Sequence, residues 1–286
     1  MPKYDKRRKY YMILDCETAT LPFADGLDEE RKKKIAIAKP LIYDLGWKIV
    51  DKNGNIYNSE NFLISEIFSV PSIFNTAYYA DKRPIYLEKL KNKEIMLTDW
   101  HTAITALLAD LEIVEAVGAY NSMFDFKKAI PFTELYINKL YSADFQNWME
   151  WQKHSCEWLA NGGTATGQTI FEEQIFRFRG QTYPLFDIWG LACQHILNCD
   201  AYKDMCIENA WSTQSGKYFK TSAETAYRFL SGNIGFDEAH TAIDDCTIEA
   251  QLFAEVVRRT KGKWEMGIEF FPFKLLGTVE KYQEGN

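Results

Sequence analysis

The stretch of residues 10–18, YYMILDCET, decides the fold, because an apolar run ends there in two acids. Residues 10–15 predict a buried β-strand. Side chains alternate between the two faces of a strand, so Asp15 and Glu17 should point to the same side at the edge of a sheet. Two carboxylates at such a short separation repel each other unless a proton or a cation lies between them. Oxygen ligands of this kind suit Mg²⁺ or Mn²⁺.

The segments around this strand predict a sheet covered by helices. Residues 41–65 predict a hairpin, with arms at 42–50 and 56–65 around an Asn53-Gly54 turn. Short strands are predicted at 114–120 and 183–186. Helical patterns lie at 28–38, 86–111, from 124 onward, and at 187–197, 221–230 and 242–259.

This order of elements predicts an α/β fold with a mixed sheet, in which an antiparallel hairpin adjoins parallel strands and helices flank both faces. The length of 286 residues suits one large domain. We expect that domain to span 1–262, with an insertion at about 131–182. The tail, 263–286, carries aromatic residues (Phe270, Phe271 and Phe273) that we expect to pack on the domain.

The composition indicates a globular protein outside the membrane. Hydrophobic residues make up 47% and charged residues 26%, so the signature of disorder is absent. No apolar run approaches the ~20 residues that span a bilayer. The basic N-terminus is not followed by an apolar run long enough for a signal peptide. Six scattered cysteines without a CxxC pair indicate reduced thiols in a cytoplasmic protein rather than a zinc site.

The net charge of −7 argues against a protein that wraps a long nucleic acid on a basic face. The net charge is compatible with a pocket that holds only the end of a nucleic-acid strand. A carboxylate cluster that binds divalent cations changes the sign of its local charge.

Two more motifs carry acids at the start of predicted helices. In NSMFDF (121–126), Asp125 alone reads as a first-turn acid favoured by the helix dipole. Asn121 either contacts a ligand or caps the helix, and the sequence leaves both readings open. In HTAIDDC (240–246), a histidine stands just before a helix with two acids one turn later. Alone, that motif reads as a helix cap with solvated acids.

Together the three motifs are far more specific than any one of them. The chain resembles the DEDDh family of 3′→5′ exonucleases, which includes the epsilon proofreading subunit of DNA polymerase III, RNase T and oligoribonuclease. These enzymes share the ribonuclease H-like fold. The matching stretches are MILDCET (12–18), GAYNSMFDF (118–126) and AHTAIDDCTIEA (239–250). The resemblance covers roughly 10–130 and 183–260, and leaves 131–182 and the tail unmatched.

The resemblance implies a site for two divalent cations, Mg²⁺ or Mn²⁺, with a histidine as general base. The implied ligands are Asp15, Glu17, Asp125 and Asp245, and the implied base is His240. Family spacing selects Asp245 over Asp244, and helix geometry agrees, because Asp245 shares a stripe with apolar residues of its helix. The related subclass with a tyrosine would need that tyrosine at position 241, where the chain has threonine.

The implied substrate is a single-stranded nucleic-acid 3′ end, with DNA favoured. The backbone near Cys16 and Thr18 should approach the terminal 3′-hydroxyl. Phe124 is a candidate for stacking the terminal base, with core packing as the alternative. An RNA-directed exoribonuclease, or a weakly active polymerase-accessory or nucleic-acid-binding module, remains an alternative function. A polymerase or replication protein is a candidate partner, and the compact domain is reminiscent of phage- or plasmid-borne relatives.

Overall fold

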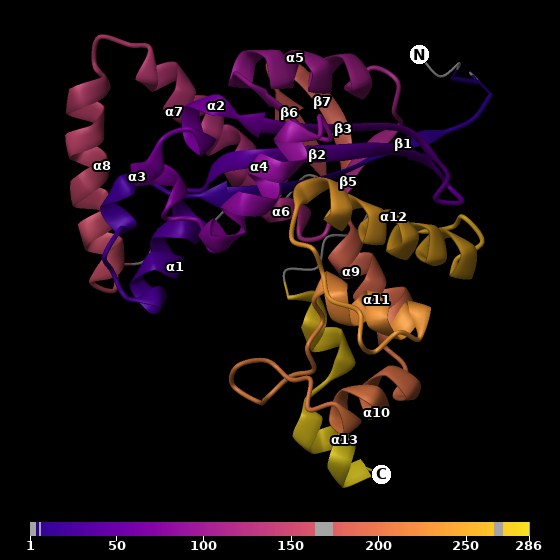
Figure 1. Cartoon of the computed structure of the whole chain (residues 1–286). Coiled ribbons are helices and arrows are strands. Elements are labelled where there is room, and N and C mark those ends of the chain that lie inside the picture. The colour runs from indigo at the N-terminus through magenta and orange to yellow at the C-terminus, as the bar shows by residue number, and fades with distance from the viewer. Residues whose placement is uncertain (1–3, 6, 164–173, 266–270, 286) are drawn as a thin grey trace.

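The computed structural model describes residues 4–5, 7–163, 174–265 and 271–285. It is an α/β protein built on a seven-stranded mixed sheet with helices on both faces (Figure 1). The strand order is β4-β3-β2-β1-β5-β7-β6. The strands are β1 (Tyr10–Ala19), β2 (Leu41–Asp51), β3 (Ile56–Ile64), β4 (Met96–Thr98), β5 (Ala116–Ala119), β6 (Ile175–Phe178) and β7 (Gln181–Asp187).

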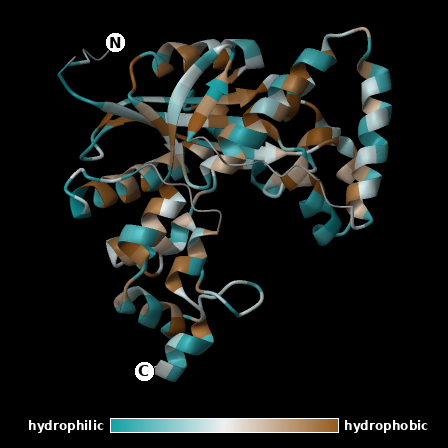
Figure 2. Cartoon of the chain, turned by 180° about the vertical axis from the view of Figure 1, so that it is seen from behind, coloured by the Kyte–Doolittle hydropathy of each residue, from teal (hydrophilic) through white to brown (hydrophobic). Residues whose placement is uncertain are grey.

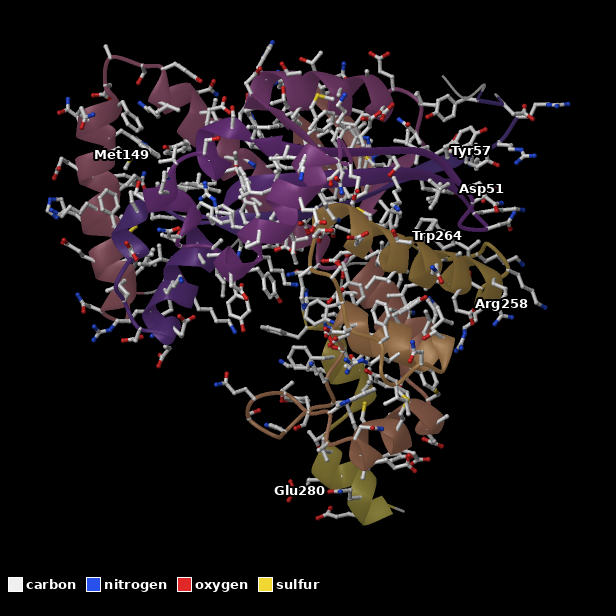
Figure 3. All side chains as sticks on the ribbon, in the orientation of Figure 1. Asp51, Tyr57, Met149, Arg258, Trp264 and Glu280 are labelled. Carbon is white, nitrogen blue, oxygen red and sulfur yellow. The ribbon has the colours of Figure 1, made fainter. Side chains whose placement is uncertain are left out.

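Strand β1 lies in the middle of the sheet, antiparallel to β2 and parallel to β5. The predicted hairpin is confirmed: β2 and β3 pair antiparallel, and their bounds agree with the predicted arms to within one residue. Figure 3 labels Asp51 and Tyr57 at the turn end of this hairpin. Asp51 accepts hydrogen bonds from the Asn53 backbone N–H (2.8 Å) and the Tyr57 hydroxyl (3.1 Å), which closes the turn.

The helices cover both faces of the sheet. The longer ones are α1 (Glu29–Ala38), α4 (Arg83–Lys91), α5 (Trp100–Leu111), α7 (Ile130–Leu140), α8 (Phe145–Ala160), α10 (Asp200–Glu208), α11 (Ala223–Ser231) and α12 (Ala242–Arg259). The shorter ones are α2 (Ser65–Phe68), α3 (Pro71–Phe74), α6 (Ser122–Phe124), α9 (Ile188–Ala192) and α13 (Val279–Gly285). Two π-helical turns, η3 (Asp125–Ala129) and η4 (Cys193–Leu197), and three 3₁₀ turns, η1 (Pro22–Ala24), η2 (Ala80–Lys82) and η5 (Pro272–Leu276), complete the chain.

Side-chain caps explain where several helices begin. Asp187 accepts the Gly190 N–H at 2.8 Å and Ser222 accepts the Thr225 N–H at 3.3 Å, so both are N-caps. Glu224 lies one position before the place where a capping box would need it, and it pairs with Arg228 at 2.9 Å.

The predicted helix at 86–111 is wrong in extent. The chain forms α4, then the short strand β4 beside β3, and only then α5. The break follows Lys93, whose φ of 62° ends α4 in the left-handed region. Asp99 restarts the helix by accepting the Thr102 N–H at 2.9 Å. The apolar spacing that suggested one helix belongs to α5 alone.

The sheet separates two hydrophobic cores. Alternation along β1 sends Met12 and Leu14 to the core beneath α2, α5 and α7, and Ile13 to the core beneath α9 and α12. Seen from behind, the strands of the sheet mix brown with white and teal, whereas the peripheral helix α8 is mostly teal and white (Figure 2). None of the helices in the described ranges has both the length and the apolar character needed to cross a membrane.

The region predicted as an insertion holds most of α7, all of α8 and strand β6. Helix α8 stands at the edge of the molecule and packs against α1 (Figure 1). Residues 164–173 of this region lie outside the described residues. In the tail, Phe273 packs at 6.1 Å from Trp189 and at 5.0 Å from Tyr218, measured between ring centroids. Phe270 lies outside the described residues.

Helix α12 lies directly on β2 at Gly46. A Cβ at this position would meet the Ile243 backbone nitrogen at 2.8 Å and the Ala242 carbonyl carbon at 2.9 Å. Only glycine therefore permits this approach. Two contacts hold the helix there, from the Cys246 thiol to the Gly46 carbonyl oxygen (3.4 Å) and from Lys48 Nζ to Thr247 Oγ1 (2.6 Å).

Gly46→Ala should destabilise the protein, because the added methyl must push the first turn of α12 away from the sheet. We expect a loss of about 1–3 kcal/mol in the free energy of unfolding, measured by urea denaturation. Gly235→Ala is the matched control, since its Cβ would find only Asn233 Oδ1 at 3.7 Å. Equal stability of the two variants would contradict the close approach of α12 to β2.

Candidate functional site

Strand β1 delivers two carboxylates to the face that α12 covers. Asp15 and Glu17 follow Ile13 at alternate positions, so they share its side of the sheet. The pairing of β1 with β2 shifts register between Glu17 and Thr18. Such a bulge bends a strand and re-aims its side chains, and bulges are frequent beside functional sites. Glu17 and Thr18 are both half-buried at this point.

Helix α12 brings Asp245 onto the same face. Asp44 of β2 anchors the start of the helix, because its buried carboxylate accepts the Ala242 N–H at 3.0 Å. Asp245 is only 7% exposed and points toward the sheet. Its neighbour Asp244 points outward and pairs with Lys89 at 2.8 Å. The two adjacent acids therefore have different environments, and Asp245 is the one that faces β1.

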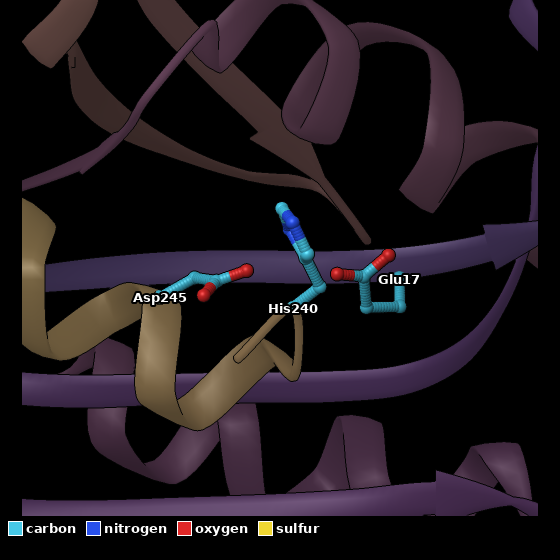
Figure 4. Close-up of side chains that lie close together, drawn as sticks. All are labelled: Glu17, His240 and Asp245. Atoms are coloured by element: carbon cyan, nitrogen blue, oxygen red, sulfur yellow. The ribbon is translucent and has the colours of Figure 1, made fainter. Parts of the chain in front are cut away.

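The loop before α12 adds His240 to these carboxylates. Glu17, His240 and Asp245 each offer one ligand atom, and these atoms lie within 4.8 Å of one another. Figure 4 shows the imidazole between the two carboxylates, with Glu17 on the strand and Asp245 on the helix. Residues more than 220 positions apart in the sequence thus meet in one cluster.

Residues outside the cluster fix the position of the His240 imidazole. Tyr79 stacks on it, with 4.3 Å between ring centroids and 14° between ring planes. Lys82 donates a hydrogen bond to the Ala239 carbonyl oxygen (2.5 Å), and Glu238 Oε2 lies 3.5 Å from His240 Nδ1. Partial burial and the positive charge of Lys82 lower the pKa of His240. A lowered pKa keeps the ring neutral near pH 7, where it can accept a proton.

Asp125 reaches the site from the other side of β1. It is 3% exposed and opens the π-helical turn η3. Its Oδ1 accepts a hydrogen bond from the Cys16 thiol at 3.0 Å. Asp187 fixes the turn before it by accepting the Ser122 N–H at 2.8 Å. Asp15 and Asp125 lie outside the 4.8 Å cluster, and their charges are close enough to act on each other.

Crowding of buried acids dominates the electrostatics of the site. Burial raises the pKa of Asp15, and the charges of Glu249, Asp125 and Asp245 raise it further. Burial, followed by the charge of Asp245, raises the pKa of Glu17. Burial raises the pKa of Asp125 to about 7. Burial and the charge of Glu238 raise the pKa of Asp245 to about 8.

This charge distribution fits a divalent cation. Asp245 Oδ1 is buried, and none of the described residues gives it a hydrogen bond. A buried carboxylate oxygen without a partner costs free energy, so such an atom points to a missing partner. Carboxylate oxygens are the ligands that Mg²⁺ and Mn²⁺ prefer. The carboxylates of Glu17 and Asp245 therefore fit such a cation by their chemistry as well as by their spacing.

The sequence reasoning missed another buried acid beside these residues, Glu249. It is 2% exposed, lies one turn after Asp245 on α12, and accepts the Tyr120 N–H at 3.2 Å. Burial and the charges of Asp125 and Asp245 raise its pKa. The i, i+4 spacing from Asp245 was a signal that could have found it. Asp44, Tyr79 and Lys82 were also missed. For Asp44 the signal was an acid within an apolar strand.

The predicted substrate contacts have mixed outcomes in the structure. Asn121 is exposed, has a left-handed backbone (φ 75°), and its side chain makes no capping bond to the described helix. The reading of Asn121 as a side-chain cap is therefore wrong. Phe124 is half-buried, whereas Phe126 is 1% exposed and packs 4.8 Å from Phe176, as expected for a core residue. Cys16 is buried, so only its backbone is a candidate for substrate contact.

Comparison with known proteins adds no assignment. No protein-family model matches the chain, and no curated protein matches it. The chemistry of the site therefore carries the functional argument.

Removal of the Asp245 charge should stabilise the metal-free protein more as the pH rises. The folded pKa of Asp245, about 8, lies above its ordinary value of 3.8. The stability that its protonation contributes is thus fully present below about pH 4 and lost as pH rises through about 8. We expect the unfolding free energy of Asp245→Asn, relative to that of the native sequence, to increase from pH 5 to pH 8 in EDTA.

The control is Asp244→Asn. Partial burial raises the pKa of Asp244, but hydrogen bonds from Lys89 and Thr241 outweigh it and lower the pKa below the ordinary value. Loss of this charge should be most harmful at neutral pH and least harmful in acid. A pH-independent difference for Asp245→Asn, measured by urea denaturation, would contradict the buried-acid environment.

Proposed function

We propose that this protein is a metal-dependent 3′→5′ exonuclease of the DEDDh type, acting on single-stranded nucleic-acid ends, with DNA favoured. One observation carries the proposal. Glu17 and Asp245, which the sequence motifs select as metal ligands, lie within 4.8 Å of the histidine that the motifs select as base.

The architecture supports the same proposal. A ribonuclease H-like fold is expected to have an antiparallel hairpin beside parallel strands, and β3-β2-β1 and β1-β5-β7 have these relationships. The motif acids lie at the end of β1, just after β5, and in the first turns of α12. Ligand sites of α/β proteins commonly occur at such strand ends.

Asp15, Glu17, Asp125 and Asp245 would hold two divalent cations in this proposal. When bound, the cations would acidify the attacking water and neutralise the charge that develops on the phosphate and the leaving oxygen. The buried carboxylates would gain the counter-charge that their raised pKa values indicate they lack.

His240 would accept the proton of the attacking water. Its pKa is lowered by burial and by Lys82, so the ring is in the form that takes up a proton. Tyr79 and Glu238 would orient the ring, the first by stacking and the second by its carboxylate near Nδ1. Orientation matters, because a general base must lie within hydrogen-bond reach of the proton it removes.

The substrate end would enter beside the β1 bulge. The backbone near Cys16 and Thr18 is the proposed contact for the terminal 3′-hydroxyl, and half-buried Phe124 the proposed stacking partner for the terminal base. The net charge of −7 agrees with a footprint limited to the end of the strand.

Asp125→Asn and Asp245→Asn should each abolish most of the Mg²⁺-dependent hydrolysis. Loss of a ligand removes several kcal/mol of transition-state stabilisation, which corresponds to a rate loss on the order of 10³-fold. Asp244→Asn is the matched control and should retain activity, because its side chain faces solvent and Lys89. The measurement is digestion of end-labelled single-stranded DNA and RNA of the same sequence, with Mg²⁺, Mn²⁺ or EDTA. Near-native activity of Asp245→Asn would refute the proposal.

His240→Ala should lower the rate and leave metal binding nearly unchanged. Loss of a general base costs about 10²- to 10⁴-fold in rate. We expect Mn²⁺ to raise the melting temperature of this variant almost as much as that of the native sequence. If the variant loses the Mn²⁺ stabilisation together with its activity, His240 is a metal ligand, not a base.

A further inference from the structure

A pocket opens where Trp189 of α9, the start of α11 and Phe273 of the C-terminal tail meet. Its volume is about 390 Å³, within the range of small-molecule sites. Aromatic rings form its walls and a lysine stands among them. We call it the Trp189 pocket, and its lining includes Tyr120, Asn121, Trp189, Lys220, Thr221 and Phe273.

The walls of the Trp189 pocket are held in place by the protein. The Trp189 ring lies 6.4 Å from the Tyr120 ring and 6.1 Å from the Phe273 ring, with interplanar angles of 27° and 23°. Trp189 Nε1 donates to Thr221 Oγ1 (2.9 Å), and the Tyr120 hydroxyl donates to the Thr221 carbonyl oxygen (2.6 Å). Since both polar groups are already bonded, the rings offer apolar faces that need no reordering to bind a flat molecule.

Two residues of the Trp189 pocket, Tyr120 and Asn121, connect it to the segments that carry the proposed catalytic residues. The Tyr120 backbone N–H donates to Glu249, which lies one turn after Asp245. Asn121 begins the turn that leads to Asp125 four residues later. Lys220 supplies a positive charge, with its ammonium 3.9 Å from Glu224. In the proposed function the scissile phosphate lies at the carboxylates, and the aromatic rings and the lysine of the pocket would be available to the nucleotides upstream of it.

We propose that the Trp189 pocket binds a nucleobase of the strand, upstream of the nucleotide being removed, by stacking it on Trp189. This inference rests on the proposed exonuclease function. Every base has an apolar face, so stacking would hold strands of any sequence, and Lys220 would contact the adjoining phosphate. The pocket would thus set the minimum length of strand that binds well.

The first test is binding without catalysis. Fluorescence anisotropy in EDTA measures the affinity of a labelled decanucleotide, and a single abasic position is moved along it from the 3′ end. One abasic position near that end should weaken binding to the native sequence about tenfold. In Trp189→Ala the same abasic position should cause almost no further loss, because the base and the ring form one interaction.

Two variants control for folding and for general effects of a missing tryptophan. Trp189→Phe keeps a ring and should keep most of the affinity and the abasic response. Trp151→Ala removes an exposed tryptophan of α8 and should change neither. If Trp189→Ala and the abasic position weaken binding independently at every position tested, the inference is refuted.

The second test separates the inference from the proposed function. The p-nitrophenyl ester of thymidine 5′-monophosphate, with Mg²⁺, reaches only the catalytic residues, whereas a pentanucleotide also reaches the pocket. Trp189→Ala should raise KM for the pentanucleotide about tenfold more than for the ester. Equal changes for both substrates would overturn the pocket and leave the exonuclease standing. Failure of the native sequence to hydrolyse either substrate would overturn the exonuclease itself.

Discussion

The site depends on one packing constraint, the contact of the first turn of α12 with β2 at Gly46. There is no room for a side chain between them, so the backbone of the helix packs directly against the backbone of β2. Asp44 fixes the end of the helix by accepting the Ala242 N–H. From this anchored start, helical geometry carries Asp245 and then Glu249 toward β1, and the loop that enters the helix carries His240 to the same place. A shift of this helix would move three functional groups at once.

That packing brings acids together at a cost in stability. Asp125, Asp245 and Glu249 are buried, and each of their pKa values is raised chiefly by burial. The two hydrophobic cores on either side of the sheet supply the free energy that holds them there. Some of the acids are partly compensated, as Asp125 is by the Cys16 thiol, but one oxygen of Asp245 has no partner among the described residues. A bound cation would therefore compensate these buried carboxylates better than the surrounding residues do.

Much of the fold could be predicted from local patterns, and its corrections have local causes. The hairpin of β2 and β3 has a strong turn signal, Asn53-Gly54, between two strand-forming arms, and this was sufficient. The single helix predicted at 86–111 was wrong because a left-handed residue at Lys93 and a cap at Asp99 outweigh helical periodicity. The motif acids were visible because each follows an apolar run or begins a helix. Glu249, Tyr79 and Lys82 were missed, because their role depends on which distant segments pack together, and one sequence does not specify that.

The backbone of His240 has a consequence for how this position tolerates change. Its φ of 51° lies in the left-handed region, which costs a residue with a Cβ on the order of 1 kcal/mol and costs glycine almost nothing. The protein therefore has a residue with a side chain at a position where glycine would have less backbone strain. Among replacements, glycine should be the gentlest on the fold, and valine or isoleucine the harshest. In the proposed function, loss of the imidazole and not backbone strain would limit substitution at position 240.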